Sequence, residues 1–396
     1  MILTKTDKDM HLMKTAFREF YFNHGNMIEI PSKIQSREFG LMGFDGVMKR
    51  HLKFSSLGGL VASLISETPA DVFVSNAQYD FPLLPINEKG WRGADLIFDI
   101  DLKDLDLKCR KTHSYTTCIS CRSSYVSSSE QICPKCGSKT FSESVLPCDK
   151  CINGLKNEVL KLHQFLTSDI GISPEMITTY FSGNNGFHVH VLDGSFNELD
   201  SQARADLAAY LMGTGILAEV IGIIVDGRSN FRIKFPIGGL DYGWRKRISE
   251  RLGIYITSQK KLTNMIREAG GLEQFRRRLA DITNEIGVQI DAQVTTDIHR
   301  VFRLPGTLNA KSGLTKIRCD DIKSFDPLDV SCQLSNREVT VKITLPELKL
   351  RLKGKKFDLN QEFVRVPLFL GIYLISKGLA HAQPSDIAQQ GSIKTF

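Results

Sequence analysis

Two aspartates separated by one residue lie at the end of an apolar run that extends from Ala94 to Leu102. The apolar residues 96–98 are typical of a buried strand. Because strand residues two apart point to the same face, Asp99 and Asp101 would lie side by side. Two such carboxylates repel each other, and burial makes each charge costly. A divalent cation would relieve both problems, since hard carboxylate oxygens suit Mg²⁺ or Mn²⁺. A strand that ends in two solvated aspartates is the alternative.

A third carboxylate, Asp291, stands in another strand-like run, residues 288–297. Arg303 follows twelve residues later, just before a Pro-Gly turn. Arginine is a good phosphate ligand, so this residue is a candidate for anion binding. Asp297 and Arg300 are also charged, and a local ion pair is the favoured interpretation of those two.

The segment Tyr180–Val191 has the pattern of a strand, a glycine-rich turn and a second strand. Gly183 and Gly186 permit positive φ and let backbone N–H groups approach an anion closely. His188 and His190 would share one face of the second strand. A histidine face beside a phosphate-sized turn indicates nucleotide binding. A hairpin with two half-buried histidines is the alternative, and it is the simpler interpretation of this segment alone.

Seven of the nine cysteines fall between Cys109 and Cys151. Two C-x2-C pairs separated by eleven residues are a strong signature of a four-cysteine zinc site. The predicted ligands are Cys118, Cys121, Cys133 and Cys136. Such a small ribbon has no core of its own, so zinc would supply its folding energy.

The remaining cysteines of this block predict a second zinc site. Its ligands would be Cys109, His113, Cys148 and Cys151. Both sites would be structural, because four protein ligands leave no open coordination position for catalysis. Cys319 and Cys332 have no partners nearby and are interpreted as core thiols.

The chain has 396 residues, 42% of them hydrophobic, and a formal net charge of +7. Its basic charge is uneven: residues 244–278 hold ten Lys or Arg against three Glu, 10 − 3 = +7. Such a patch suits a polyanion, and a solvated helix face is the alternative. A second basic cluster spans Lys349–Lys356.

Two features bear on location. The first seven residues lack a secretory pattern. The apolar stretch Val366–Ile375 contains Pro367 and is too short to span a bilayer. We therefore expect a soluble, cytoplasmic protein without membrane contact, in which cysteines serve metal binding rather than disulfides.

Four sequence motifs occur in a defined order between about residues 37 and 313. They are Arg37-Glu38-Phe39 with Arg50, the strand Gly93–Asp101, the turn Ser182-Gly183-x-x-Gly186-x-His188-x-His190, and Asp291 with Val294-Thr295 followed by Arg303–Leu308. Together they resemble the catalytic small subunit of archaeo-eukaryotic DNA primases. The ordered set is far more specific than any single motif.

The resemblance implies an α/β (α+β) primase-type catalytic core with a zinc-binding insertion and a helical insertion. It implies a replication enzyme, a DNA-directed nucleotidyltransferase that makes short RNA primers on single-stranded DNA. Asp99 and Asp101 would hold two Mg²⁺ or Mn²⁺ ions, and Asp291 would complete the site. The implied nucleotide-binding residues are Ser182, Gly183, His188 and Arg303, with Arg50 and Glu38 in support.

The resemblance also implies partners: a separate large regulatory subunit, a single-stranded DNA template and nucleoside triphosphates. Residues 245–278 would follow template phosphates. The chain departs from the family pattern at two places. Asn184 and Asn185 stand where many relatives have an arginine, and Asn309 stands where relatives usually have a histidine. Both changes remove a possible phosphate contact.

The expected organisation is a catalytic core interrupted by two insertions. Core segments are predicted at 1–104, 153–194 and 286–335, the zinc-binding insertion at 105–152, the helical basic segment at 195–285 and a C-terminal extension at 336–396. Helices are predicted up to about Phe22 and over Leu155–Phe165, and a strand over Val339–Leu345.

Three rival functions fit part of the pattern. A repair or translesion polymerase of the same superfamily would use the same acidic site. A non-catalytic zinc-ribbon nucleic-acid-binding protein explains the cysteines and the basic charge but leaves the three aspartates without a purpose. A metal-dependent nuclease is a weaker option, since acidic triads also serve hydrolysis.

Overall fold

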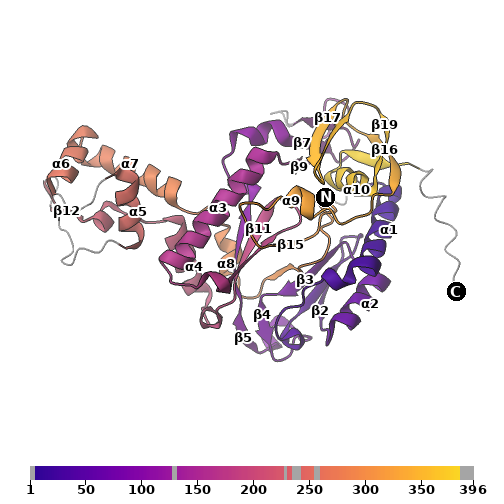
Figure 1. Cartoon of the computed structure of the whole chain (residues 1–396), viewed down its shortest axis with the longest axis horizontal. Helices are drawn as coiled ribbons and strands as arrows, with labels where there is room; N and C mark the ends of the chain where they lie inside the picture. The colour runs from indigo at the N-terminus through magenta and orange to yellow at the C-terminus, as the bar shows by residue number, and fades with distance from the viewer. Residues whose placement is uncertain (1–4, 127–131, 227–229, 234–241, 254–258, 384–396) are drawn as a thin grey trace.

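The computed structural model describes residues 5–126, 132–226, 230–233, 242–253 and 259–383. It has a main body of mixed helices and strands, from which an arm projects (Figure 1). The arm is made of α5 (Gly243–Leu252), α6 (Gln259–Glu268), α7 (Leu272–Ile286) and the hairpin of β12 (Ile223–Asp226) and β13 (Asn230–Ile233). The predicted mixed fold is confirmed, and helices make up most of this arm.

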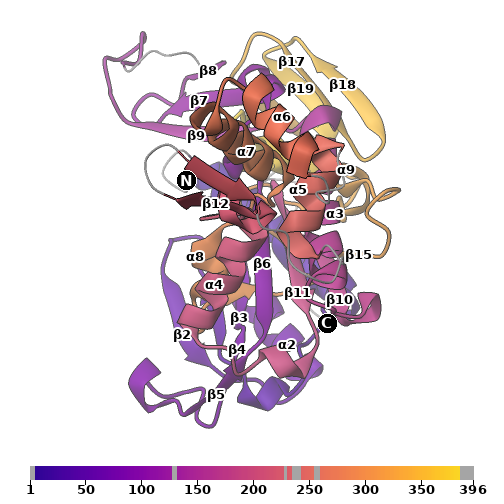
Figure 2. The ribbon, with the colours of Figure 1, turned by 90° about the vertical axis from the view of Figure 1, so that its left-hand side faces the viewer.

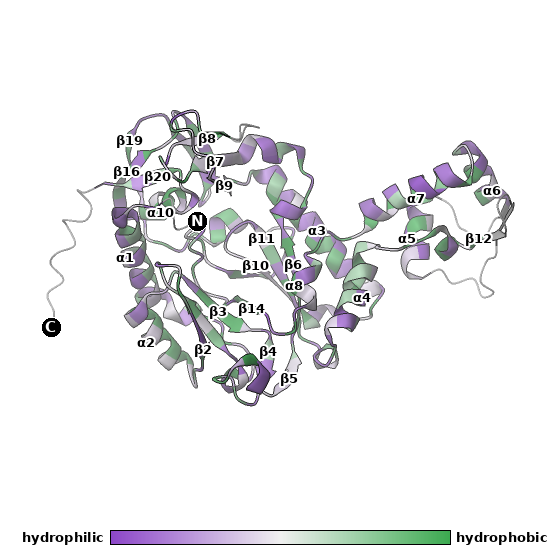
Figure 3. Ribbon diagram, turned by 180° about the vertical axis from the view of Figure 1, so that it is seen from behind, coloured by the Kyte–Doolittle hydropathy of each residue, from purple (hydrophilic) through white to green (hydrophobic). Residues whose placement is uncertain are grey.

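Two antiparallel four-stranded sheets form the centre of the main body. The first has the order β14 (Val301–Arg303), β3 (Asp71–Ser75), β1 (Phe39–Met42) and β2 (Met48–Leu52). The second has the order β15 (Ile317–Cys319), β10 (Ile177–Phe181), β11 (Gly186–Val191) and β6 (Leu96–Asp101). Figure 3 shows the two sheets in the same part of the body, and a small hairpin of β4 (Ala77–Tyr79) and β5 (Trp91–Ala94) lies beyond them.

The second sheet has one apolar face and one polar face. Phe98 and Ile100 of β6 are fully buried, and α3 (Asp149–Ser168) packs against β6 and β11. Asp99 and Asp101 alternate with these residues and are partly exposed. This period of two is the pattern predicted for the strand. The polar face is therefore available for chemistry.

Short helices and the insertions complete the layers around this sheet. Figure 2 shows α4 and α8 beside β6, in agreement with their packing contacts. These helices are α4 (Ser201–Met212) and α8 (Ala292–Thr296), while α9 (Pro327–Val330) follows β15. The cysteine-rich insertion forms a three-stranded sheet with the order β8 (Ser124–Val126), β7 (Ser114–Cys118) and β9 (Phe141–Val145).

The two ends of the described chain pack together. α1 (Asp7–His24) contacts α2 (Leu57–Glu67) and α10 (Leu368–Lys377). Oδ1 of Asp9 accepts a hydrogen bond from the backbone N–H of Ala382 at 2.7 Å. Oδ2 of Asp9 lies 2.8 Å from Nδ1 of His381. The C-terminal sheet has the order β19 (Phe363–Pro367), β16 (Glu338–Ile343) and β20 (Ala380–Ala382), and the hairpin of β17 (Leu348–Leu352) and β18 (Lys355–Leu359) carries the second basic cluster.

The helices predicted at the N-terminus and over Leu155–Phe165 are confirmed by α1 and α3, and the predicted strand at Val339–Leu345 by β16. All ten residues of α10 are buried. Within the described ranges, no helix combines the length and the apolar character that crossing a bilayer would require.

Candidate active site

Two remote segments bring three carboxylates together. β6 presents Asp99 and Asp101 on its polar face. Asp291 is the N-cap residue of α8, which packs against β6, and its backbone N donates to the carbonyl oxygen of Asp99 at 3.0 Å. The expected strand around Asp291 is wrong, because its side chain accepts a hydrogen bond from the N–H of Gln293 and starts a short helix instead. The structure nevertheless joins all three predicted acids.

The acidic cluster is electrostatically strained. Burial and the neighbouring charges of Asp101 and Asp291 raise the pKa of Asp99 to about 7. Lys103 offers partial compensation, with its Nζ 3.4 Å from Oδ2 of Asp291 and its side chain 56% exposed. Three carboxylates that destabilise one another's charge fit a divalent cation, whose oxygen ligands they would become.

The glycine-rich turn lies directly against the end of β6. Gly186 is paired with Asp101 in the register of β11 and β6. A Cβ on Gly186 would lie 2.4 Å from the carbonyl oxygen of Ile100, so a side chain has no room at this position. Gly183 has φ +81°, and its backbone approaches that of Leu314. The predicted hairpin is therefore confirmed, with a positive φ at Gly183. Ser182 begins the turn, and its N–H donates to the Gly186 carbonyl at 2.9 Å.

His188 faces the acidic cluster from the neighbouring strand. It pairs with Asp99 in the register, and its Nε2 lies 3.6 Å from Oδ1 of Asp99. Burial and the charge of Lys316 hold the pKa of His188 well below its usual value, so the imidazole is neutral. His190 shares this face, as predicted from the alternation of the strand.

Lys316 belongs to this site but was not predicted from the sequence. Its buried Nζ lies 3.1 Å from Nδ1 of His188 and donates to the carbonyl oxygen of Arg303 at 2.9 Å. Burial, followed by the charge of Arg303, lowers its pKa to about 7. No motif marks Lys316; the only sequence signal is a lysine directly before the short strand β15.

Two predicted cations are already paired with carboxylates. Nη1 of Arg303 lies 2.6 Å from Oδ1 of Asp71, and the side chain is 9% exposed. Nε of Arg50 lies 2.8 Å from Oε1 of the fully buried Glu38. Lys89, also buried, lies 3.4 Å from the other oxygen of Glu38. Arg50, Glu38 and Lys89 thus form one ion-pair cluster beside the first sheet, and their support of the nucleotide stays a prediction.

A cavity of about 380 Å³ with both polar and apolar lining residues lies between the two sheets. Its lining includes His190, Asp95, Arg303 and the largely buried Asn76. Among the residues that the structure describes, Oδ1 of Asn76 has no hydrogen-bond partner, so it is a buried acceptor that a ligand could satisfy. Phe302 also lines the cavity, and its ring centroid lies 5.5 Å from that of His188. The cavity therefore adjoins the histidine face.

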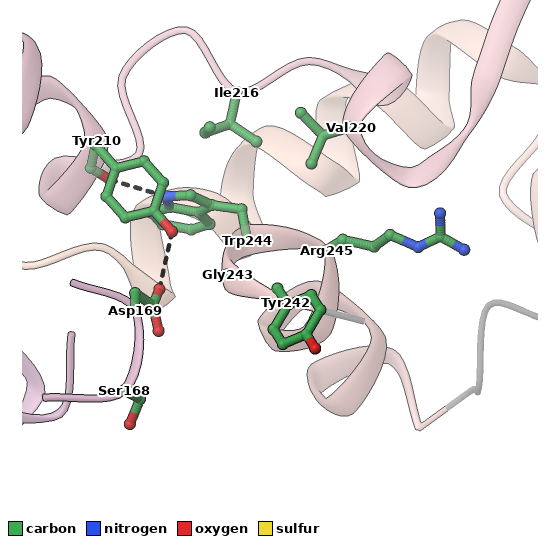
Figure 4. Close-up of a pocket in the computed structure, with 9 residues that line it drawn as sticks. All are labelled: Ser168, Asp169, Tyr210, Ile216, Val220, Tyr242, Gly243, Trp244 and Arg245. Carbon is green, nitrogen blue, oxygen red and sulfur yellow. Dashed lines mark hydrogen bonds between the residues drawn. The ribbon is translucent and has the colours of Figure 1, made fainter. Parts of the chain in front are cut away.

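A second cavity, of about 350 Å³, lies where the arm meets the body (Figure 4). None of the predicted catalytic, nucleotide-binding or metal-binding residues lines it, but Arg245 of the basic segment does. Asp169 in its wall accepts a hydrogen bond from the hydroxyl of Tyr210 at 3.0 Å and forms an ion pair with Arg247 at 2.7 Å. Nε1 of Trp244 donates to the carbonyl oxygen of Tyr210 at 2.8 Å. These contacts attach the arm to the body.

The cysteine-rich insertion contains two groups of sulfur atoms. In the first group, the sulfurs all lie within 4.8 Å of one another, and it consists of Cys118, Cys121, Cys133 and Cys136. The second group has the same spacing and consists of Cys109, Cys148 and Cys151. The four-cysteine group could hold a metal such as zinc. The predicted fourth ligand, His113, is not part of this second group. Its backbone carbonyl oxygen accepts a hydrogen bond from the N–H of Leu146.

The basic segment has both paired and unpaired members. Arg247 pairs with Asp169, Arg251 with Glu285 and Arg276 with Glu273. Arg277 and Arg278 are exposed on α7, and the structure records no ion pair for them among the described residues. The arm thus keeps part of its positive charge accessible.

Comparison with known proteins agrees with these motifs. The family model described as DNA primase small subunit matches residues 98–320, more than half of the chain. The chain belongs to the DNA primase small-subunit family. DNA primase small subunit PriS of Cenarchaeum symbiosum (strain A) is 40% identical over 378 residues, which cover 95% of this chain and 99% of the relative. The same subunit of Nitrosopumilus maritimus (strain SCM1) is 39% identical, covering 94% and 99% respectively.

More distant primase small subunits match over nearly the same length. The subunit PriS of Archaeoglobus fulgidus is 30% identical over 378 residues, covering 92% of this chain and 96% of the relative. The family resemblance inferred from ordered motifs is therefore confirmed. Membership of the primase family also supports a nucleotidyltransferase type of enzyme.

Proposed function

We propose that this chain is the catalytic subunit of a primase, which synthesises short RNA primers on single-stranded DNA from nucleoside triphosphates. The convergence of Asp99, Asp101 and Asp291 beside the glycine-rich turn carries the proposal. Carboxylates next to a phosphate-sized turn suit a cation-dependent reaction at a triphosphate. A purely structural role would not favour three mutually repelling and partly buried acids at one place.

Asp99, Asp101 and Asp291 would hold the divalent cations. Unlike the cysteine sulfurs, these carboxylates do not form a group whose oxygens all lie within 4.8 Å of one another among the described residues. Two cations that share these ligands are the arrangement that the family resemblance implies. When bound, the ions would activate the 3′-hydroxyl and neutralise charge on the departing pyrophosphate.

The turn and the histidine face would orient the triphosphate. Backbone N–H groups of the turn would approach phosphate oxygens, and Gly183, with φ +81°, permits the shape of that turn. The neutral imidazole of His188 carries one proton. With that proton on Nε2, Nδ1 accepts a hydrogen bond from Lys316, and the Nε2–H group faces Asp99. Arg303 and Ser182 stay candidates for phosphate contacts, and Arg303 would have to share its guanidinium with Asp71.

The cavity between the sheets is a candidate site for the nucleoside. It shares His190 and Arg303 with the phosphate-binding side and offers the free acceptor of Asn76. The exposed cations of the arm would contact template phosphates. A separate large subunit is the expected partner, and zinc is the proposed ion of the four-cysteine group.

An unprimed single-stranded DNA template, labelled nucleotides and Mg²⁺ or Mn²⁺ test this function. Wild-type protein should make new oligonucleotides, whereas Asp101→Asn should abolish synthesis with unchanged thermal unfolding and zinc content. A primed template run in parallel separates de novo synthesis from extension. Full activity of Asp101→Asn, or extension without any new starts, would contradict the proposal.

A further inference from the structure

A buried lysine near the end of the described chain reaches the glycine-rich turn. Lys377 is the last residue of α10 and is only 6% exposed. Its Nζ donates to Oδ1 of Asn184 at 2.8 Å and to Oδ1 of Asn185 at 3.3 Å. The C-terminal extension therefore supplies a cation to a turn that contains no Lys or Arg between residues 182 and 186.

The same turn borders the acidic cluster. Its Asn185 carbonyl oxygen accepts a hydrogen bond from the N–H of Leu102 at 2.9 Å, directly after Asp101. The negative charge of Asp101 also acts on Lys377. The ammonium thus lies at the end of β6 where the turn and the carboxylates meet.

Lys377 has no counter-ion of its own. Its hydrogen-bond partners are neutral amide oxygens, and no carboxylate forms an ion pair with it in the described part of the chain. Burial lowers its pKa to about 7 despite the opposing effect of Asp101. A buried ammonium without an anion is costly. By contrast, Arg303 and Arg50 are each neutralised by a carboxylate.

We propose that Lys377 is a triphosphate-binding residue, whose ammonium contacts the phosphates of the incoming nucleotide at the Asn184-Asn185 turn. This inference rests on the proposed function, because it assigns a ligand contact in the same site. A phosphate supplies the anion that the buried ammonium lacks. The two amide oxygens hold the ammonium in place without competing as charged groups.

The cysteine-rich insertion positions this lysine. Gly378, the next residue, has φ +75° and ends α10. Its carbonyl oxygen accepts hydrogen bonds from Oγ of Ser124 at 3.1 Å and Oγ1 of Thr117 at 3.4 Å. Both donors are buried and lie in strands of the insertion. The insertion therefore fixes the backbone directly after Lys377 and acts on the nucleotide site through it.

Binding of inorganic tripolyphosphate to the zinc-loaded protein, in buffer without Mg²⁺ or Mn²⁺ and without a chelator, tests the contact. Calorimetry of the full-length protein should show affinity at least about 10-fold weaker for Lys377→Met than for wild type, and a loss smaller than this for Lys377→Arg. The nucleotide KM should rise for Lys377→Met more than kcat falls. Lys342→Met is the matched control, since Lys342 is 45% exposed and pairs with Glu362 outside the site.

Thermal unfolding separates binding from a structural role. Removing an uncompensated buried charge should leave the Tm of Lys377→Met unchanged or raised. Unchanged tripolyphosphate affinity and nucleotide KM in Lys377→Met would overturn the inference. A wild-type protein that binds tripolyphosphate through Lys377 but synthesises nothing would instead refute the proposed function alone, so the two failures are distinguishable.

Discussion

At the scale of single residues, the chemistry of this site depends on neighbours that are remote in sequence. The aspartate spacing predicts that Asp99 and Asp101 share a strand face, and the structure confirms it. Lys316 and Lys377 could not be predicted, since tertiary packing alone brings Lys316 to His188 and Lys377 to the glycine-rich turn. The pairing of Arg303 with Asp71 was equally hidden, because the two residues are 232 positions apart.

The raised pKa of Asp99 predicts a pH-dependent effect of divalent cations on stability. Without a cation, the folded protein keeps this proton up to about pH 7, while the unfolded chain releases it near pH 4. The stability from the protonated group is therefore complete below about pH 4 and is lost as pH rises through about 7. Mn²⁺ should raise Tm more at pH 8 than at pH 6, where it must displace the proton.

Differential scanning calorimetry at the two pH values measures this effect. At a cation concentration 100 times Kd, the gain in unfolding free energy is about 2.7 kcal/mol. Asp99→Asn should lose the pH dependence of the gain. An equal gain at pH 6 and pH 8 in wild type would show that Asp99 does not bind the ion.

At the scale of elements, periodicity predicts most of the framework. Alternation predicts β6 and the β10–β11 hairpin, and helical spacing predicts α1 and α3. It fails around Asp291, where Val288 and Ile290 alternate as in a strand and are buried, but the chain then forms the short helix α8. The N-capping carboxylate, rather than the apolar pattern, decides that local structure.

The four-cysteine ribbon is the element whose loss we expect to affect the distant nucleotide site. Cys118→Ser with Cys121→Ser should release about one zinc equivalent, because a closed site needs all four thiolates. The nucleotide KM should rise at the same time, since Ser124 and Thr117 lose their place beside Gly378. Metal analysis and steady-state kinetics measure the two effects. Cys319→Ala, outside both sulfur groups, is the control that should keep its zinc.

At the scale of the whole molecule, the arm and the C-terminal segment both pack against the main body. The arm projects from the body in Figure 1, and its attachment depends on Asp169 and Arg247. The extension returns to α1 and to the glycine-rich turn. Composition predicted a basic insertion, but it could not show that Arg247 and Arg251 are paired, because their partners Asp169 and Glu285 lie in other segments of the chain.

The exposed cations of the arm should set the salt dependence of template binding. Arg277→Ala with Arg278→Ala should weaken binding of a single-stranded oligonucleotide and reduce the slope of log K against log salt by about 1.4. Arg251→Ala with Arg276→Ala removes the same charge from ion-paired positions and should change the slope less. Fluorescence anisotropy over a salt series gives both slopes. Equal slopes for the two double variants would exclude a template contact by Arg277 and Arg278.

The most direct test of the acidic centre is Mn²⁺ binding measured by electron paramagnetic resonance on the zinc-loaded protein. Wild type should bind Mn²⁺ at the centre, more tightly with a non-hydrolysable nucleoside triphosphate present, and both Asp101→Asn and Asp291→Asn should bind it at least about 10-fold more weakly. Lys342→Met should match wild type. Unchanged Mn²⁺ affinity in both aspartate variants would contradict a cation site formed by these carboxylates.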